Sequence, residues 1–275
     1  MTTDLAFDHD YATFVHRVRR LVGVDLAGYK PEQMRRRLLA LAQRHGQQSL
    51  TGFAVTMERE PAALNAFKNF FTINVSEFLR DPARWNDLAE RVLPELVQGA
   101  GGRPLKIWSA GCSYGAEPYT LAMLLLERRP TPPFRVLATD IDETILARAR
   151  AGAGYLENDL RNLDERRRTA AFSREADGSY TVKPAVRSRV HFQRHDLLGE
   201  APDGGFDLIV CRNVVIYFTE AAKRVLYKRL FEALRPGGVL FVGGTEVVAG
   251  ARELGLEPFQ TSFYRRGGVR VPALR

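Results

Sequence analysis

From Leu105 onward, the sequence alternates between short apolar runs and segments with helical spacing. The apolar runs are LKIWSAG (105–111), FRVLATDID (134–142), VHFQRHDLL (190–198), FDLIVC (206–211) and VLFVGGTE (239–246). The segments between them include PYTLAMLLLERR and EAAKRVLYKRLFEAL, which read as helices. Apolar strands that alternate with helices are typical of a parallel, doubly wound sheet. The pattern predicts an α/β fold, with a turn at RPGG (235–238) and a last, antiparallel strand at FQTSFYRR (259–266).

One stretch interrupts this alternation. Residues 152–190 are too polar for a strand of the sheet and too long for a simple connection. Within them, Asp177-Gly178 separates two short strand-like segments, which is a hairpin signal. We therefore expect a small antiparallel β-subdomain at about 152–190, inserted into a larger domain over residues 86–266, and a loose tail over residues 267–275.

Residues 1–85 read as helix after helix and are expected to form an N-terminal helical domain with a linker. Apolar residues recur at helical spacing over 11–21 and 31–45, and LTGFAVTMER and PAALNAFKNFF continue the pattern. Pro31 suits the first position of its helix, where no backbone N–H is needed.

The helix expected at 31–45 has an apolar face and a basic face. The apolar face comprises Met34, Leu38, Leu41 and Ala42, and the basic face comprises Arg36, Arg37 and Arg44. The chain carries a formal net charge of +8, and this N-terminal region contributes much of the excess. A basic block indicates an acidic partner, which could be nucleic acid, an anionic membrane or an acidic protein surface. A solvated helix face is the alternative.

Composition excludes several classes of protein. With 45% hydrophobic and 26% charged residues, the chain has a globular composition, and it lacks the roughly 18 consecutive apolar residues of a membrane span. Its acidic N-terminus has no apolar run, so no signal peptide is expected. The two cysteines, Cys112 and Cys211, lack metal-ligand spacing, which predicts neither a metal site nor a disulfide and favours the cytoplasm. No dimer seam is visible, and a monomer is expected.

The loop after the first strand, in WSAGCSYGAEPY, has the features of a ligand-binding turn. Gly111 and Gly115 let the backbone approach a ligand, and a helix expected to open at Pro118 offers free N–H groups. The spacing is not the G-x-G-x-x-G of dinucleotide-binding folds. Glu117 would repel a pyrophosphate but suits a cationic ligand such as S-adenosyl-L-methionine, which has a sulfonium, an ammonium and no phosphate. A tight strand–helix turn without a ligand is the alternative.

Polar residues also end the later strands. Asp140 ends the second strand, where nucleotide folds hold ribose hydroxyls, whereas Asp142 either competes for that role or caps the next helix. Asp196 follows the third strand and is either a site residue or a turn residue. Arg212 and Asn213 follow the fourth strand and are costly to bury without partners, so we expect them to face the site.

If the ligand is the methyl donor S-adenosyl-L-methionine, a motif that is absent after the fourth strand narrows the class of methyl acceptor. Methyltransferases that act on nucleobase amines usually carry an Asn/Asp-Pro-Pro-aromatic motif at this place, and it is absent here. A carboxylate or hydroxyl oxygen is therefore favoured as the acceptor. Cys112 and Cys211 flank the expected site without an activating partner and read as small buried fillers.

The segment TINVSEFLRD (72–81) is polar and lies between apolar helices. Composition alone favours a capping role, with Asn74 or Ser76 as N-cap of the next helix and Arg80 on its surface.

Taken in order and spacing, these segments resemble the CheR-type chemotaxis protein methyltransferases over residues 10–266. The motifs that carry the resemblance are TINVSEFLRD, WSAGCSYGAEPY, LATDID, HDLL, FDLIVCRNVVIYF and LRPGG. The resemblance implies a helical N-terminal domain and a Rossmann-like class I methyltransferase sheet with an inserted β-subdomain. It implies methyl transfer from S-adenosyl-L-methionine to glutamate carboxylates of chemoreceptors, giving methyl esters and S-adenosyl-L-homocysteine.

The resemblance also implies roles for individual residues and reverses the capping interpretation of residues 72–81. The implied cofactor contacts are Asn74, Ser76, Arg80, Glu117, Asp140, Asp196, Leu197, Arg212 and Asn213. Arg80 and Tyr217 match the family's residues nearest the transferred methyl group. Two positions depart mildly from the family, which often has threonine at Ser76 and asparagine at Asp196.

The implied partner is the cytoplasmic helical bundle of chemoreceptors, which is rich in glutamates. We expect Arg36, Arg37 and Arg44 to contact it, and in some family members a receptor C-terminal peptide docks on the β-subdomain. Neither nucleic acid nor membrane insertion is expected. Two rival classes are a nucleic-acid methyltransferase, which the basic block favours, and a binding module without catalysis, which the retained acidic and Arg-Asn positions disfavour.

Overall fold

The computed structural model describes residues 2–71 and 76–267, and the chain divides into two compact units. The helical unit comprises Met1–Ile73 and Tyr217–Lys223, and the sheet unit comprises Asn74–Ile216 and Arg224–Arg275. None of the helices in the described ranges combines the length and the apolar content that crossing a membrane requires.

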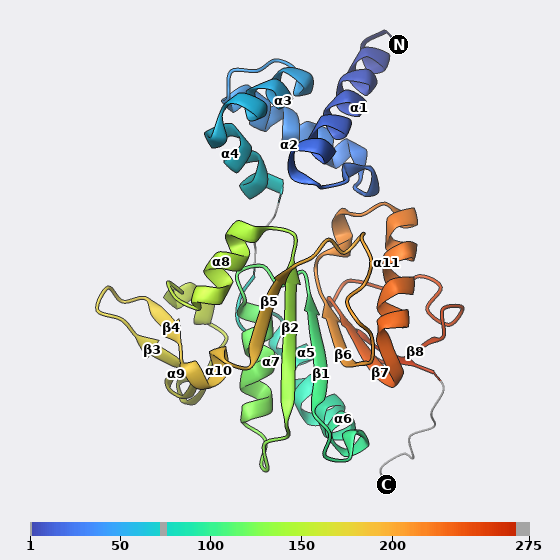
Figure 1. Cartoon of the computed structure of the whole chain (residues 1–275). Coiled ribbons are helices and arrows are strands. Elements are labelled where there is room, and N and C mark those ends of the chain that lie inside the picture. The colour runs from blue at the N-terminus through green and yellow to red at the C-terminus, as the bar shows by residue number, and fades with distance from the viewer. Residues whose placement is uncertain (1, 72–75, 268–275) are drawn as a thin grey trace. The chain divides into compact units, whose positions relative to one another are not determined.

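The helical unit contains four α-helices and one 3₁₀ turn in its first segment. They are α1 (Thr2–Val22), η1 (Leu26–Gly28), α2 (Pro31–Arg44), α3 (Leu50–Arg59) and α4 (Pro61–Phe71). The sequence placed the start of the first helix at residue 11, but α1 already begins at Thr2 (Figure 1). The last three helices begin where the sequence predicts.

Aromatic packing and end caps hold this unit together. Phe14 of α1 lies 5.9 Å from Phe67 of α4 and 6.5 Å from Phe53 of α3, measured between ring centroids. The carboxylate of Asp10 accepts hydrogen bonds from the first backbone N–H groups of α3, and Ser49 is the N-cap of that helix. These bonds satisfy N–H groups that a helix start leaves free.

The sheet unit is built on seven strands in the order β5-β2-β1-β6-β7-β9-β8. The strands are β1 (Leu105–Ala110), β2 (Phe134–Asp140), β5 (Val190–Arg194), β6 (Phe206–Cys211), β7 (Leu234–Val242), β8 (Leu256–Gln260) and β9 (Phe263–Arg266). The first five pair in parallel, whereas β8 and β9 are antiparallel. Burial along β6 is continuous, as expected for a strand covered on both faces.

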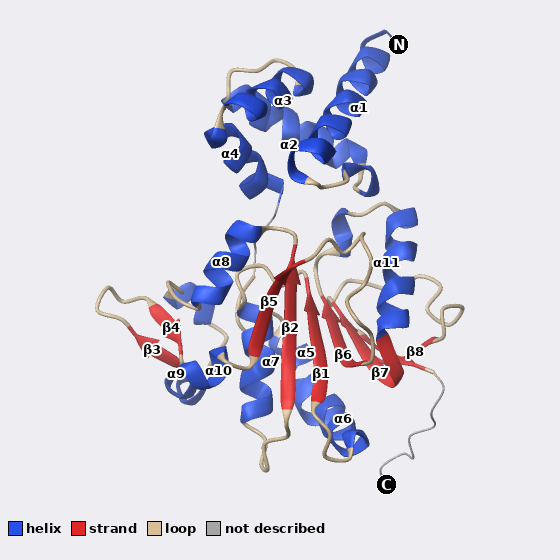
Figure 2. Cartoon of the chain, in the orientation of Figure 1, coloured by secondary structure: helices blue, strands red, loops and turns tan. Residues whose placement is uncertain are grey.

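Helices and turns precede or connect these strands (Figure 2). They are α5 (Pro82–Asp87), η2 (Leu88–Val92), α6 (Leu93–Ala100), α7 (Ala116–Leu126), α8 (Glu143–Ala151), η3 (Glu157–Leu160), α9 (Glu165–Ala171), α10 (Pro184–Arg187), η4 (Val215–Tyr217) and α11 (Glu220–Ala233). Both α7 and α8 pack on β2 and β5, and α6 packs on β1. The doubly wound α/β prediction is confirmed.

The small antiparallel sheet predicted within residues 152–190 is present. Strands β3 (Phe172–Arg174) and β4 (Tyr180–Val182) pair antiparallel around a turn in which Gly178 has a φ of 83°. RPGG lies within β7, which already begins at Leu234, but the pairing of β7 with β6 is irregular there and Gly237 has a φ of 77°. The single strand predicted at 259–266 is wrong, because these residues contain the end of β8, a turn and β9. In that turn Ser262 has a φ of 71°, so the chain reverses there.

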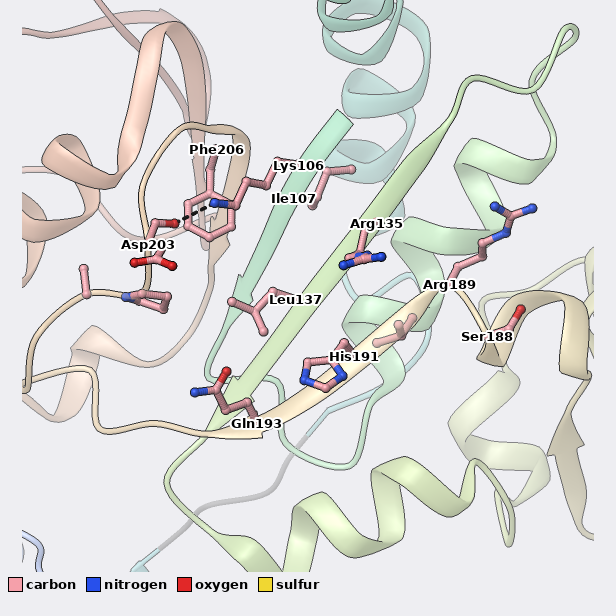
Figure 3. A pocket seen from close by; sticks show the side chains of 13 residues that line it. Lys106, Ile107, Arg135, Leu137, Ser188, Arg189, His191, Gln193, Asp203 and Phe206 are labelled. Carbon is pink, nitrogen blue, oxygen red and sulfur yellow. Dashed lines mark hydrogen bonds between the residues drawn. The ribbon is translucent and has the colours of Figure 1, made fainter. Parts of the chain in front are cut away.

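One face of the sheet is left open where β5 leads to β6. Residues 195–205 make this connection without a helix. A hollow of about 760 Å³ lies there, over β1, β2 and β5 (Figure 3). Its lining includes Lys106, Arg135, Leu137, His191 and Gln193. This hollow lies on the face of the sheet, away from the strand ends considered next.

Candidate active site

The parallel strands all end at the same edge of the sheet, which we call the carboxyl edge. Their last residues are Ala110, Asp140, Arg194, Cys211 and Val242. In open α/β sheets, ligands bind outside this edge, because the connecting loops and helix N-termini meet there.

Asp140 lies at the end of β2, as the sequence predicts. Its carboxylate accepts hydrogen bonds from the backbone N–H of Ser113, at 2.8 Å, and of Asp142, at 3.1 Å. Burial raises the pKa of Asp140, and the two backbone bonds offset this only in part. Asp142 instead caps α8 through Thr144 and Ile145, so the capping alternative is the correct one for Asp142.

Glu117 lies in the first turn of α7, the helix that follows β1. The helix begins at Ala116 and not at Pro118, so Glu117 is inside it and not just before it. The hydroxyl of Ser109 donates to the carboxylate of Glu117 at 2.7 Å. Burial raises the pKa of Glu117 to about 7; Arg212 lowers it in part, and Glu246 raises it further.

The two loop glycines meet a steric need. Gly111 has a φ of 83°, and a Cβ there would lie 2.6 Å from the side chain of Val214. Gly115 has a φ of 94°, and a Cβ there would lie 3.1 Å from the ring of Tyr119. Side chains at these positions are excluded, as expected for a backbone that turns tightly from strand to helix.

Arg212 is buried at the end of β6. Its guanidinium lies over the rings of Phe241, at 4.7 Å, and Trp85, at 5.3 Å, and an ion pair of 3.6 Å joins it to Asp81. Burial lowers the pKa of Arg212, and within the described part of the chain its Nε has no hydrogen-bond partner. A buried donor of this kind needs a partner from outside the chain, such as a water molecule or a bound ligand.

The segment 76–81 belongs to the sheet unit and is tied to its helices and loops. The backbone N–H of Leu79 donates to Thr120 of α7, and that of Phe78 donates to the carbonyl of Asp159. The following helix α5 begins at Pro82 with Asp81 at the N-cap position, so Ser76 does not cap it. Asn74, the other capping candidate, lies outside the described residues. The capping interpretation is therefore wrong for Ser76.

Arg80 is half-buried in this segment and lies within electrostatic reach of Glu117 and Arg212. Its charge lowers the pKa of both Glu117 and Arg212. Leu79 and Asp81, on either side of it, have φ values of 52° and 67°, which non-glycine residues rarely adopt. Backbone strain of this kind persists where the surrounding structure fixes it and is common at functional sites.

Asp196 and Leu197 follow β5 at the same edge. The carbonyl of Asp140 accepts from the backbone N–H of His195, which ties the start of this loop to β2. One carboxylate oxygen of Asp196 accepts from the N–H of Leu198 at 2.9 Å, and Leu197 is buried. This hydrogen bond stabilises the turn that follows Asp196 and uses one of its two carboxylate oxygens.

Two acidic residues at this edge were missed from the sequence. Asp81 pairs with Arg212, and Glu246, after β7, accepts hydrogen bonds from the backbone of Asn213 and Gly243. Glu246 follows an apolar strand, as Asp140 does, and that signal could have identified it. No local pattern distinguished Asp81 from a helix cap. Cys112 and Cys211 are buried with raised thiol pKa values, as fillers should be.

The remaining predicted residues belong to the helical unit. Tyr217 is half-buried, and its carbonyl accepts from the backbone N–H of Lys30 at 3.0 Å. Arg36 and Arg44 are exposed on α2, opposite the buried face that the sequence predicts. Arg37 differs, because its guanidinium lies 4.8 Å from the ring of Phe70 and donates to the carbonyl of that residue. Its expected place on the outward basic face is therefore wrong.

The carboxyl edge of the sheet unit suits a cationic ligand without phosphate. More carboxylates than guanidinium groups gather there, namely Asp81, Glu117, Asp140 and Glu246 against Arg80 and Arg212. Burial raises the pKa values of Glu117, Asp140 and Glu246, and the neighbouring guanidinium groups and hydrogen bonds offset this only in part. In residues 2–71 and 76–267, no cluster of potential metal ligands accompanies them.

Comparison with known proteins agrees with this geometry. Residues 9–72 match the family "CheR methyltransferase, all-alpha domain", and residues 74–262 match "CheR methyltransferase, SAM binding domain". A chemotaxis protein methyltransferase of Listeria monocytogenes is 40% identical, over 94% of this chain and 97% of its own length. Chemotaxis protein methyltransferase 1 of Pseudomonas aeruginosa is 34% identical, over 88% of this chain and 92% of its own length.

Among solved structures, a glycopeptide N-methyltransferase in complex with S-adenosyl-L-methionine is 20% identical over 54% of this chain and 51% of that one, with a TM-score of 0.34. Both parts of the chain, the helical segment and the sheet with its acidic carboxyl edge, match one family of enzymes that use S-adenosyl-L-methionine. On these matches, the chain belongs to the CheR methyltransferase family.

Proposed function

We propose that this enzyme transfers a methyl group from S-adenosyl-L-methionine to glutamate carboxylates of chemoreceptors. The products are glutamate methyl esters and S-adenosyl-L-homocysteine, and the reaction serves chemosensory adaptation. The observation that carries the proposal is the group of three carboxylates around Arg212 at the carboxyl edge, Asp81, Glu117 and Glu246, in a chain that matches both domains of the family.

The chemistry asks little of acid–base catalysis. When bound, S-adenosyl-L-methionine supplies a methyl group on a sulfonium sulfur, which the acceptor oxygen displaces in line. A glutamate side chain has a pKa of about 4.3 and is already an anion at neutral pH, so no general base is needed. The residues of the enzyme must mainly position the acceptor and exclude water, and positioning can lower a barrier by about 7–11 kcal/mol.

The cofactor-binding residues we propose are those at the carboxyl edge. Asp140 would hold the ribose hydroxyls and Glu117 the cationic end of the methionine part. Ser76, Arg80, Asp196, Leu197, Arg212 and Asn213 complete the described part of the site, and Asn74 is proposed with them. The buried Nε of Arg212 and the raised pKa of Glu117 support this assignment.

Arg80 and Tyr217 are the proposed catalytic residues. The guanidinium of Arg80 would orient the acceptor carboxylate, although it must not pair with it so tightly that the oxygen loses its reactivity. Tyr217 would donate a hydrogen bond near the methyl group or pack its ring against the sulfonium. We expect Arg80→Ala and Tyr217→Phe to lower kcat more than they raise the Kd of the cofactor. Normal turnover at saturating substrate would remove either residue from this role.

The partner we propose is the helical bundle of a chemoreceptor, reached in the cytoplasm by a monomeric enzyme. Exposed Arg36 and Arg44 on α2 match the charge of a glutamate-rich surface. Arg37 is kept as a weaker candidate because it already contacts Phe70. The β3–β4 hairpin is a candidate site for a receptor C-terminal peptide.

Methyl transfer with a labelled cofactor tests this function. Purified receptor cytoplasmic fragments and oligonucleotides are offered separately, and label in the protein is then exposed to mild base. We expect label in the receptor only, with base-labile release, because methyl esters hydrolyse readily. Label in the oligonucleotide would favour the nucleic-acid alternative, and cofactor binding without any transfer would favour a module that has lost catalysis.

A further inference from the structure

Glu246 is a buried carboxylate beyond the end of β7, and it is not among the proposed cofactor contacts. It is 7% exposed. Its Oε2 accepts two backbone hydrogen bonds, from Gly243 at 2.7 Å and from Asn213 at 3.0 Å. These donors follow different strands, so one oxygen joins the end of β6 to the end of β7.

The residues that Glu246 holds are shaped for this contact. Asn213 has a φ of 58°, a left-handed conformation that asparagine adopts more readily than most non-glycine residues and that its hydrogen bond to Glu246 helps to hold. A Cβ at position 243 would lie 2.6 Å from Oε2 of Glu246 and 3.1 Å from Nδ2 of Asn213. The close approach of the three residues therefore requires glycine at position 243.

The charges around Glu246 show that this contact is costly. Burial raises the pKa of Glu246, while its bonds to Asn213 and Gly243 and the charge of Arg212 lower it in part. Glu117 and Cys211 also lie within its electrostatic reach. Its second oxygen, Oε1, is buried and has no hydrogen-bond partner in the described ranges. A half-satisfied buried carboxylate opposes stability, so its presence indicates a role in the site.

We propose that Glu246 is a positioning residue of the methyl-donor site, which acts by holding the left-handed turn at Asn213 and thereby fixes where Arg212 and Asn213 lie. The inference rests on the proposed cofactor contacts of those two residues. It needs no receptor, so it can fail or succeed independently of the acceptor assigned above.

Two variants separate the hydrogen-bonding role from the charge. Glu246→Gln keeps an oxygen at the same reach and removes the charge, whereas Glu246→Asp keeps the charge and draws the oxygen back by one methylene. Affinity for S-adenosyl-L-homocysteine is measured by calorimetry on the full chain. We expect Glu246→Asp to weaken binding about tenfold or more and Glu246→Gln to retain most of the affinity. The reverse order would overturn the proposal.

Gly243→Ala provides a test that leaves the chemistry of Glu246 and Asn213 unchanged. The added Cβ should displace the carboxylate and reproduce the loss seen in Glu246→Asp. Gly99→Ala is the matched control. A Cβ there would make only an ordinary contact with Arg235, at 3.7 Å, and would touch neither Glu246 nor Asn213. Wild-type affinity in Gly243→Ala would overturn the proposal.

Amide hydrogen exchange in the cofactor-free protein gives a readout that does not depend on binding. We expect faster exchange over residues 211–216 in Glu246→Asp and Gly243→Ala than in Glu246→Gln and Gly99→Ala. Asn213→Ala is tested alongside. If it binds the product normally, the cofactor contact assigned to Asn213 is wrong, whereas unchanged exchange in Glu246→Asp would show that Glu246 does not hold the turn.

Discussion

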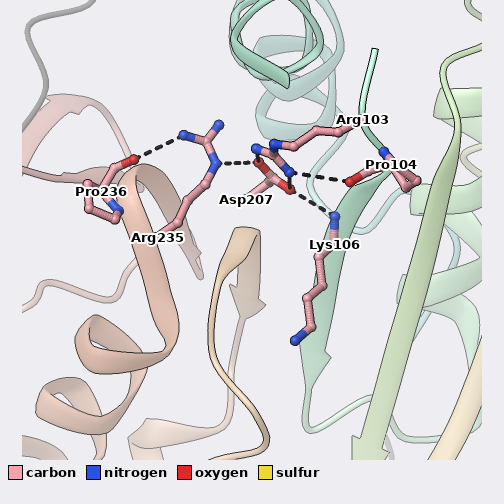
Figure 4. Close-up of polar contacts among 6 residues, drawn as sticks. All are labelled: Arg103, Pro104, Lys106, Asp207, Arg235 and Pro236. Atoms are coloured by element: carbon pink, nitrogen blue, oxygen red, sulfur yellow. Dashed lines mark hydrogen bonds and ion pairs between the residues drawn. The ribbon is translucent and has the colours of Figure 1, made fainter. Parts of the chain in front are cut away.

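The two edges of the central sheet treat buried acids in opposite ways. At the start of β6, the fully buried Asp207 accepts hydrogen bonds from Arg103, from Arg235 and from the backbone N–H of Lys106 (Figure 4). Burial alone would raise its pKa, but these bonds outweigh burial and lower it. At the carboxyl edge, Glu117 has a pKa raised to about 7.

The difference separates an acid that stabilises the fold from acids that serve the binding site, either directly or by positioning its residues. Asp207 gains partners from Arg103, just before β1, and from Arg235 in β7, and its charge stabilises the fold above its ordinary pKa. Glu117 and Glu246 have raised pKa values, so they contribute most stability at low pH, and this contribution is lost as the pH rises through the pKa of the folded state. A cationic ligand beside Glu117 would offset that loss.

The largest effect on stability or binding is expected where the parallel strands begin, which we call the amino edge. Asp207→Asn should lower the free energy of unfolding by about 3 kcal/mol, because it leaves two arginines without their buried counter-charge. Denaturant unfolding measures the change, and cofactor affinity should stay near wild type. Asp203→Asn is the matched control, since Asp203 is exposed and offers only its carbonyl to Lys106. Equal stability of the two variants would contradict the structural role of Asp207.

At the carboxyl edge the same kind of change should affect binding. We expect Asp140→Ala to weaken S-adenosyl-L-methionine binding by about 1.5–3 kcal/mol, the cost of lost hydrogen bonds to a charged group. Asp142→Ala should instead cost about 1 kcal/mol of stability, as the loss of a helix cap does, and leave the affinity intact. Calorimetry and thermal unfolding of both variants would show whether the two roles are separate or exchanged.

A change of pH should alter binding somewhat less than the Asp140→Ala substitution does. In the free protein the pKa of Glu117 is about 7, and a cationic ligand favours the ionised form. Affinity for S-adenosyl-L-methionine should therefore rise with pH and be about tenfold weaker at pH 6 than at pH 8, since one pH unit below the pKa leaves about a tenth of the group ionised. Glu117→Gln should bind weakly and lose this dependence. A flat profile in the unchanged enzyme would mean that Glu117 does not meet the cation.

The smallest effect is expected outside both edges, on α2. An exposed arginine contributes about 0.2–1 kcal/mol, so reversing both Arg36 and Arg44 to glutamate should raise the KM for receptor by roughly threefold to tenfold. Added salt should reduce the difference, because it screens exposed charges. Reversal of the exposed Arg91 and Arg252 is the control for net charge. Equal effects of both pairs would assign the result to overall charge.

Several features of this protein were determined by the sequence alone. The alternation from Leu105 predicts the parallel sheet, Asp177-Gly178 predicts the hairpin, and the spacing of Met34 and Leu38 predicts the buried face of α2. Each of these is local, because backbone periodicity and turn chemistry depend on residues only a few positions apart. Asp140 was predictable for the same reason, since a residue at the end of a parallel strand must lie at the carboxyl edge.

Only the tertiary structure decided which charged residues are paired. Asp207 meets Arg103 and Arg235, and Asp81 meets Arg212, across long separations in sequence that no local pattern encodes. Burial and charge pairing depend on which strands become neighbours, and they set the pKa of each acid. The sequence could therefore place acids at the edge of a sheet. Three-dimensional packing alone distinguished Asp207, which stabilises the fold, from the acids of the binding site.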